Sequence, residues 1–277
     1  MTPQQTYQTI ASHLNAEDIV FPTSVQVALR LKEMLEDPEC HIEQAAKLVS
    51  AEPLLASKVV AVANSVAYNR AGREISDIRM AVSRLGFSTL RTLAMGLVAR
   101  QLAKSHQACN PKVAEQLWTH TAHVASLAHA LARHVTHVDA ETALFAGIVH
   151  EIGGFYLLSQ QPELDALGDE EFAEWLETGN ALVGRAIINK LALPGAVTDV
   201  LEHYWEGYLT MPPSSLADTL LLADALAPVA SPLGPDMQGI SAETAAQIEM
   251  LVGSDTLSEI LAESKEEIDS LIQALQA

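Results

Sequence analysis

The feature that most constrains the fold of this chain is a series of apolar runs with helical spacing and almost no strand pattern. Alanine and leucine dominate stretches such as LASKVVAVA, RTLAMGLVARQLA and HVASLAHALARHV, and both residues favour the helix strongly. No period-2 alternation extends beyond a few residues, and no Asn-Gly or Asp-Gly hairpin dipeptide occurs. The sequence therefore predicts an all-α fold.

Local signals place some helix starts and the breaks between groups of helices. Pro53 suits the first turn of a helix, and Ser264 with Glu267 has the spacing of a capping box. Polar or Pro-rich breaks occur at 105–112 and 227–241. We expect three parts: an N-terminal helical half at 1–105, a helical core at 106–228, and a Pro-rich loop with a C-terminal helical extension at 229–277.

Composition excludes several classes of protein. Lys and Arg total 16 against 35 Asp and Glu, a net charge of -19, which repels phosphate backbones and disfavours nucleic-acid binding. The two cysteines, Cys40 and Cys109, imply no disulfide framework. The N-terminus MTPQQTYQTI lacks a signal-peptide pattern, and we expect no apolar run as long as the roughly 18 residues of a membrane span. These features predict a soluble, cytoplasmic protein without a membrane partner.

The histidines raise the question of a metal site. Six of the ten fall between positions 106 and 137, some of them in i, i+3 pairs that share a helical face. None belongs to the His-Glu-x-x-His pattern of a zinc protease. For most of this group we expect surface or half-buried helix positions: His123, His129, His134 and His137.

A sharper candidate site is dispersed along the chain: His120, the doublet His150-Glu151, and Asp224 within the apolar run LLLADALA. A buried carboxylate needs a cation, a donor or a metal. Imidazole with carboxylate suits Mn, Fe, Ni or Zn, and such an ion could activate water toward a phosphoester. The alternative, a helix-end His beside a capping or solvent-facing Glu, stays open.

Two long stretches resemble a known family. The segment at 21–69, FPTSVQVALRLKEMLEDPECHIEQAAKLVSAEPLLASKVVAVANSVAYN, together with LWTHTAHVASLAHALARHV and DAETALFAGIVHEIGGFYLL, is similar to the HDOD domain, the HD-related output domain of bacterial signalling proteins. The resemblance covers roughly residues 18–228. Its hallmark steps are Glu52-Pro53-Leu54-Leu55, Ala63-Asn64-Ser65, the helix with Ala81 to Gly86, and LALPGAVTDVLEHYW with His203 near its end.

The resemblance implies a bacterial protein with an N-terminal helical subdomain packed on an HD-like core at 106–228. Members of this family act as regulatory or scaffold modules without an established reaction. The chain would then be a stand-alone signalling module that works through protein contacts with a signalling partner in trans. The first hypothesis is therefore a protein without enzymatic activity, and no residue is assigned a catalytic role.

The chain departs from the metal-binding HD pattern at two positions. Glu151 replaces the Asp of the doublet, and Asn180 stands where two-metal relatives carry a further His. Because Glu adds a methylene and metal sites tolerate errors of only about 0.2 Å, a degenerate or merely binding pocket is favoured. The alternative hypothesis is a mononuclear metal-dependent phosphohydrolase that acts on phosphomonoesters or phosphodiesters. Its candidate metal ligands are His120, His150, Glu151 and Asp224.

Four further residues are candidates for the lining of a ligand pocket: His203, Asn180, Asn64 and Arg84. The Asn64 amide could instead end a helix, because Asn favours such local bonding. Arg84 could bind a carboxylate or phosphate bidentately, or it could pair with one of the many acids of the chain.

Overall fold

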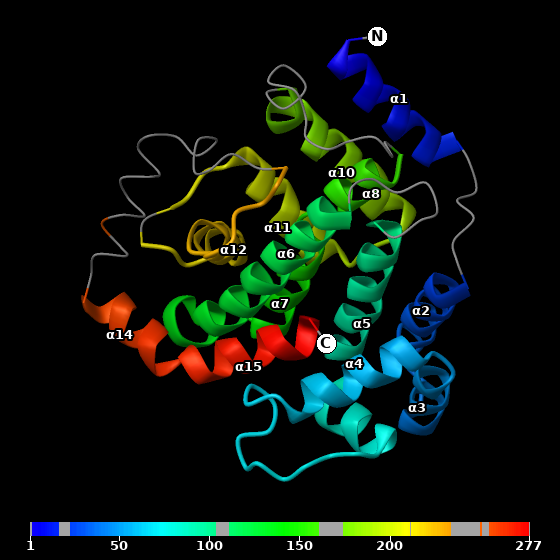
Figure 1. Cartoon of the computed structure of the whole chain (residues 1–277), viewed down its shortest axis with the longest axis vertical. Coiled ribbons are helices and arrows are strands. Elements are labelled where there is room, and N and C mark those ends of the chain that lie inside the picture. The colour runs from blue at the N-terminus through cyan, green and yellow to red at the C-terminus, as the bar shows by residue number, and fades with distance from the viewer. Residues whose placement is uncertain are drawn as a thin grey trace.

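The computed structural model describes residues 2–16, 23–103, 111–160, 174–210, 212–233, 250 and 255–276. Every regular element in these ranges is a helix, which confirms the predicted all-α fold (Figure 1). The helices are α1 (Pro3–Ala16), α2 (Thr23–Met34), α3 (Ile42–Ser50), α4 (Pro53–Asn64), α5 (Ile78–Ala103), α6 (Pro111–Leu131), α7 (Ala140–Val149), α8 (Ile152–Gln160), α10 (Asn180–Lys190), α11 (Gly195–Glu206), α12 (Leu216–Ala225), α14 (Asp255–Glu263) and α15 (Lys265–Gln276), with π-helical turns η1 (Ala132–Thr136) and η2 (Trp175–Gly179).

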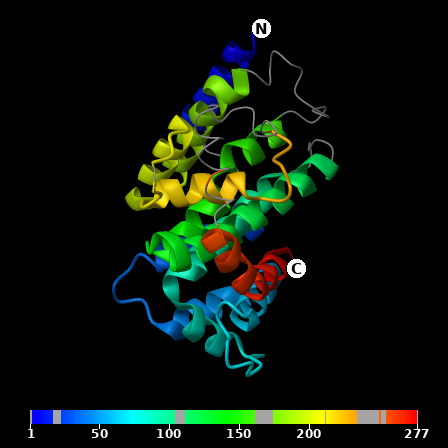
Figure 2. The ribbon, with the colours of Figure 1, turned by 90° about the vertical axis from the view of Figure 1, so that its left-hand side faces the viewer.

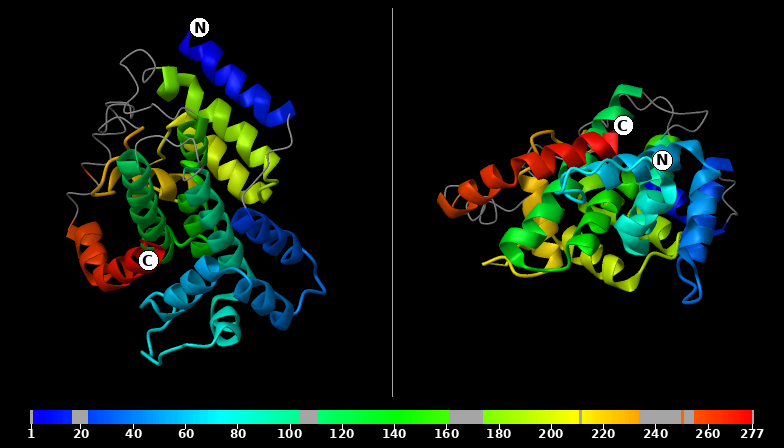
Figure 3. Two further views of the ribbon diagram at one scale, coloured as in Figure 1. Left: turned by 45° about the vertical axis from the view of Figure 1, so that its right-hand side comes forward. Right: turned by 90° about the horizontal axis from the view of Figure 1, so that it is seen from below.

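Helices α6 and α7 run through the middle of the molecule (Figure 1). Helices α1 and α10 lie at one end and α2, α3 and α4 at the opposite end, an order that the view turned by 90° repeats (Figure 2). Helix α15 crosses this arrangement and packs on both α6 and α4, so the C-terminal helix joins the N-terminal part to the centre (Figure 3). The expected boundaries near 105 and 228 stay predictions, and residues 104–110 lie outside the described ranges.

A close crossing of α6 and α7 sets the geometry of the centre. A Cβ on Gly147 would lie 2.5 Å from the Cα of Ala125 and 2.9 Å from its nitrogen. Only glycine allows two backbones to approach so closely. The crossing stands one turn before His150 and little more than one turn after His120, and it therefore brings these two histidines to the same side of the helix pair.

The helix-start signals have different outcomes at Pro53 and Ser264. Pro53 is the first residue of α4, and the Glu52 carboxylate accepts a hydrogen bond from the Leu55 N–H at 2.6 Å. The capping box predicted for Ser264 and Glu267 is wrong. The Ser264 N–H donates to the Ile260 carbonyl at 2.9 Å, and the Glu267 carboxylate turns instead toward cationic side chains, whose charge outweighs one N–H donor.

The expectation about apolar runs also needs correction. The run 140–159, which contains α7 and α8, has the length and composition of a membrane span. However, 94% of its most apolar window is buried inside the fold. A core helix pair of a globular protein has the same composition, so the run by itself indicates core packing.

Candidate metal centre

The structure brings together the four residues that the sequence predicts as metal ligands. His120 lies on α6, His150 and Glu151 connect α7 to α8, and Asp224 lies in the last turn of α12. The Nε2 atom of His120 is 3.2 Å from Nε2 of His150 and 3.2 Å from Oδ1 of Asp224. His120, His150 and Glu151 are at most 4% exposed. Segments separated by 30 residues and more thus meet in one buried polar cluster, the His150 pocket.

Backbone carbonyls fix the orientation of both imidazoles. The Val229 carbonyl is 2.8 Å from Nδ1 of His120, and the Gly147 carbonyl is 2.7 Å from Nδ1 of His150. Because a carbonyl only accepts, each Nδ1 carries a proton and donates it. Both Nε2 atoms are left facing the pocket. Histidines that bind metals are oriented by the same kind of outer hydrogen bond.

The surroundings shift the pKa values of the two histidines in opposite directions. Burial lowers the pKa of His120, but the hydrogen bond to Asp224 and the charges of Asp224 and Glu151 outweigh it, so this pKa is raised. Burial and the nearby charge of His120 lower the pKa of His150. Burial raises the pKa of Asp224, yet the hydrogen bond and charge of His120 bring it below its ordinary value. His120 is therefore the proton donor of the pocket, with neutral His150 and ionised Asp224 as acceptors.

Tyr204 is a pocket residue that the sequence analysis missed. Its hydroxyl, on α11, donates to Oδ2 of Asp224 at 2.9 Å. Its ring stands edge-on to His150, with centroids 5.6 Å apart and planes at 85°. Burial and the charge of Asp224 raise the pKa of Tyr204, which keeps it a donor. The hydroxyl of a half-buried tyrosine needs a hydrogen-bond partner. This requirement could have directed attention to Tyr204 in the sequence.

The segment 226–233 after α12 closes the pocket. The Ser231 hydroxyl donates to Oε1 of Glu151 at 2.8 Å, while Oε2 of Glu151 is buried without a hydrogen-bond partner in the described part of the chain. Leu233 is 1% exposed. A Cβ on Gly154 would lie 2.8 Å from Leu233 and 3.0 Å from Oε2 of Glu151. Glycine at 154 thus leaves the space in which the segment and the carboxylate meet.

The donor atoms of this pocket fit one transition-metal ion. One ligand atom each from His120, His150 and Glu151 lies within 4.8 Å of the others. Two imidazole nitrogens bound to one tetrahedral ion at about 2.0–2.1 Å would be roughly 3.3–3.4 Å apart, close to the 3.2 Å observed between the Nε2 atoms. The unpartnered Oε2 of Glu151 supplies the carboxylate. Asp224 is outside this compact trio and contacts it through His120 and Tyr204.

Asn64 and Arg84, two of the pocket candidates, have their hydrogen bonds elsewhere. The Asn64 amide bonds both the carbonyl and the N–H of Ile75, at 2.6 and 2.8 Å. It thereby ends α4 and holds the loop that follows. Arg84 donates to Oδ1 of Asn69 at 2.5 Å in that same loop. Both residues stabilise the connection between α4 and α5, away from the pocket.

The other two candidates are also not among the contacts of His120 and His150. His203 is exposed on α11, and its Nδ1 is 2.7 Å from the Asp199 carbonyl. Asn180 begins α10, and its backbone oxygen packs beside Gly153 of α8. Its side-chain oxygen is buried without a hydrogen-bond partner among the residues described. A pocket role for these two residues stays a prediction.

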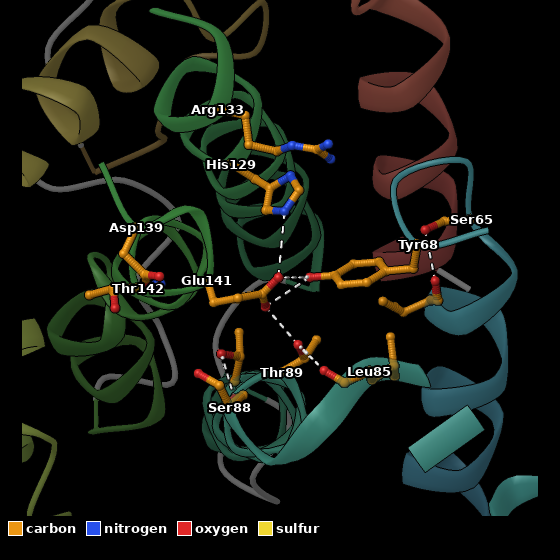
Figure 4. Close-up of polar contacts among 12 residues, drawn as sticks. Ser65, Tyr68, Leu85, Ser88, Thr89, His129, Arg133, Asp139, Glu141 and Thr142 are labelled. Atoms are coloured by element: carbon orange, nitrogen blue, oxygen red, sulfur yellow. Dashed lines mark hydrogen bonds and ion pairs between the residues drawn. The ribbon is translucent and has the colours of Figure 1, made fainter. Parts of the chain in front are cut away.

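A second buried polar cluster surrounds Glu141, which the sequence analysis did not identify (Figure 4). The carboxylate accepts from the Tyr68 hydroxyl at 3.0 Å and from the Thr89 hydroxyl at 2.6 Å, and it pairs with Nε2 of His129 at 3.7 Å. Burial raises the pKa of Glu141, but the bonds from His129, Thr89 and Tyr68 outweigh it and lower this pKa. The expectation of a surface or half-buried His129 is wrong, since the residue is 2% exposed.

Comparisons with known proteins agree with this architecture. The chain resembles a candidate metal-dependent phosphohydrolase from Shewanella amazonensis SB2B at 21% identity and a TM-score of 0.66, over 99% of both chains. It resembles an HDOD domain protein of unknown function from Geobacter sulfurreducens at 23% identity and a TM-score of 0.64, over 98% of both. A candidate signal transduction protein from Marinobacter aquaeolei VT8 matches at 21% identity and a TM-score of 0.59, over 99% of this chain and 66% of the other.

These structural matches establish the fold, and the family follows from the sequence itself. A search of the curated proteins finds no match. The family model of the HDOD domain matches residues 21–206, which is most of the chain and includes His120, His150 and Glu151. The chain therefore belongs to the HDOD domain family.

Proposed function

We propose that the chain is a cytoplasmic regulatory module that acts through contacts with a separate signalling protein. Its HD-like pocket would bind a metal ion or a small ligand without efficient hydrolysis of a phosphoester. The observation that carries this proposal is the closure of the pocket by the chain itself. Val229 and Ser231 hydrogen-bond to His120 and Glu151. Family membership supports the regulatory role, as does the likeness to a protein described as acting in signal transduction.

Closure opposes catalysis for a physical reason. Hydrolysis of a phosphoester needs room for the substrate and an accurately placed water. His120 and His150 are at most 2% exposed, and Leu233 is buried behind the same segment. On the side that the segment 226–233 covers, a substrate could reach the pocket only after that segment had left it.

The test is a turnover assay on the full chain, purified without a metal-affinity tag. Hydrolysis of a generic phosphomonoester and a generic phosphodiester is measured with Mn, Fe, Ni or Zn, for the wild type and for His150→Ala. We expect background rates in both proteins. His203→Ala serves as a matched control, because His203 is exposed on α11. Robust wild-type turnover that His150→Ala abolishes and His203→Ala retains would contradict the regulatory proposal.

The facing Nε2 atoms and the unpartnered Glu151 oxygen favour a second candidate, a mononuclear metal-dependent phosphohydrolase. His120, His150 and Glu151 would hold the ion, which would supply Lewis-acid activation of a water when bound. Tyr204 would keep Asp224 oriented as the acceptor for the His120 proton. The same assay decides between the candidates, because only this one requires turnover that depends on His150.

The Pro-rich loop 227–241 is one place where a partner could bind. Its first residues contact the pocket. Residues 234–241 lie outside the described ranges. A partner that bound this loop could therefore also open the His150 pocket. Partner binding and access to the pocket would then be coupled.

A further inference from the structure

Four basic side chains converge on one carboxylate of the C-terminal helix. Glu267 of α15 has a side chain only 8% exposed. Arg133 pairs with its Oε1 at 2.9 Å and Arg70 with its Oε2 at 3.0 Å. His129 and His134 face the same carboxylate at 3.6 and 3.9 Å. The whole chain has 16 Lys and Arg against 35 Asp and Glu. A cluster of four basic side chains therefore contrasts with its net negative charge.

When both imidazoles are protonated, the four basic side chains offer more donors than Glu267 uses. Each carboxylate oxygen already pairs with one arginine. Nδ1 of His129 and Nε2 of His134 are buried and have no hydrogen-bond partner in the described structure, since 3.6 and 3.9 Å are too long for such bonds. The side chain of His129 is only 3% exposed, and its Nδ1 is aimed at Glu267. A group with more oxygens at this place would meet donors that the carboxylate leaves unmet.

A cavity beside the carboxylate gives room for a larger group. It has a volume of about 600 Å³ and is lined by Asn69, Arg70, His134, Ser264 and Glu267, among others. Small-molecule pockets have volumes of roughly 300–1,000 Å³. Glu263 and Glu266 also line the cavity, but both are exposed, where solvent and salt screen their charge.

We propose that Arg70, Arg133, His129 and His134 form a binding site for the phosphoryl group of a small molecule, and that Glu267 is its built-in occupant. A phosphoryl group presents three or more acceptor oxygens and binds arginine in bidentate fashion. It can satisfy both arginines and the two unpartnered imidazole nitrogens, which a carboxylate with two oxygens cannot. The ligand takes the place of Glu267, so its binding loosens the N-terminal turn of α15. The site shares no residue with the His150 pocket.

The test removes the built-in occupant from the full-length chain and offers inorganic phosphate as the probe. In Glu267→Ala, phosphate should raise the thermal unfolding midpoint by several degrees relative to chloride at equal ionic strength, because a ligand that binds only the folded state stabilises it. Glu259→Ala is the matched control, an exposed acid on the neighbouring helix α14 that does not line the cavity. The control and the wild type should show a smaller shift, because Glu267 competes with phosphate for the same donors.

A double variant locates the site. In Glu267→Ala with Arg133→Ala, the phosphate-specific shift should be lost. The proposal is overturned if Glu267→Ala responds to phosphate no more than Glu259→Ala does, or if the double variant keeps the full response. Should Glu267→Ala not fold, Glu267→Gln keeps the shape without the charge. Titration calorimetry of this variant should then show one phosphate per chain, and heat equal to that of the wild type would equally overturn the proposal.

Discussion

The two buried polar clusters lie on the same helix and have opposite character. Around His120, two imidazole nitrogens face each other, with Glu151 and Asp224 close by. Around His129, nine residues further along α6, each ring nitrogen faces a different carboxylate, and two arginines add charge. The first cluster has lone pairs to offer to a cation. The second has donors to offer to an anion.

The difference follows from which elements cover α6. The His150 pocket is built from α6, α7, α8 and α12, with α11 and the segment after α12 above it. The other cluster is built from α6, η1, α7 with Glu141, α5 with Thr89, the loop after α4, and α15. The same helix thus presents imidazoles to acid-rich neighbours at one end and to a mixed set with arginines at the other. One helix can carry two binding chemistries when different partners flank it.

The largest expected effect comes from separating α6 and α7, on which both clusters depend. In Gly147→Ala, the new Cβ would meet the Ala125 backbone at 2.5 Å, and overpacking of this kind costs about 1–3 kcal/mol, occasionally more. We expect a loss near 3 kcal/mol in the free energy of unfolding, measured with urea. Gly195→Ala is the control, because its Cβ meets nothing within 4 Å. An equal effect of the two variants would show that the crossing does not hold the clusters.

A metal titration sharpens the contrast between the clusters. If the His150 pocket holds one ion, Zn at a concentration 100 times the dissociation constant should stabilise the wild type by about 2.7 kcal/mol. The unfolding midpoint of His150→Ala should not respond, while that of Glu267→Gln should respond like the wild type. Elemental analysis checks the stoichiometry. Zinc stabilisation that survives His150→Ala and disappears in Glu267→Gln would reverse the assignment of cation and anion sites.

The smallest expected effect is a dependence of stability on pH that belongs to the second cluster. The pKa of Glu141 is lowered in the fold, so its contribution is fully present above the unfolded value near 4.3 and is lost as pH falls through the lowered folded value. Glu141→Gln should flatten the loss of stability below about pH 4.3 by on the order of 1 kcal/mol. Urea unfolding at pH 3 to 6 measures this. If the unfolding free energies of the wild type and of Glu141→Gln fell in parallel at low pH, Glu141 would have the same pKa in the folded and unfolded states.

The sequence predicted much of the fold and a set of four candidate ligands that the structure brings close together. Apolar periodicity and the start of α4 at Pro53 depend on local physics, and the resemblance named His120, His150, Glu151 and Asp224 before the structure brought them together. The contacts it could not supply are long-range. Ser231 reaches Glu151 across 80 residues, and Arg133 reaches Glu267 across 134. Helical spacing predicts which face is buried but not which helix covers it.

The burial of polar residues is the other feature that the sequence did not predict. His129 stands in an alanine-rich run that marks a buried face, yet the prevalence of exposed histidines in general argued for the surface. Two carboxylates beside its ring stabilise its burial: Glu141, on the neighbouring helix α7, and Glu267, on the C-terminal helix α15. Such pairings depend on the whole fold, because each partner alone would be costly to bury.

The contacts of the segment after α12 bear on how fast an ion could enter the His150 pocket. Val229, Ser231 and Leu233 contact the His150 pocket. If ions enter on this side, they reach the imidazoles only while these contacts are broken. Loading would then proceed no faster than the spontaneous opening of the segment. The observed uptake rate would level off as the ion concentration rises, and the plateau would report the opening rate itself. Gly154, by leaving space for Leu233, would then help to set this opening rate.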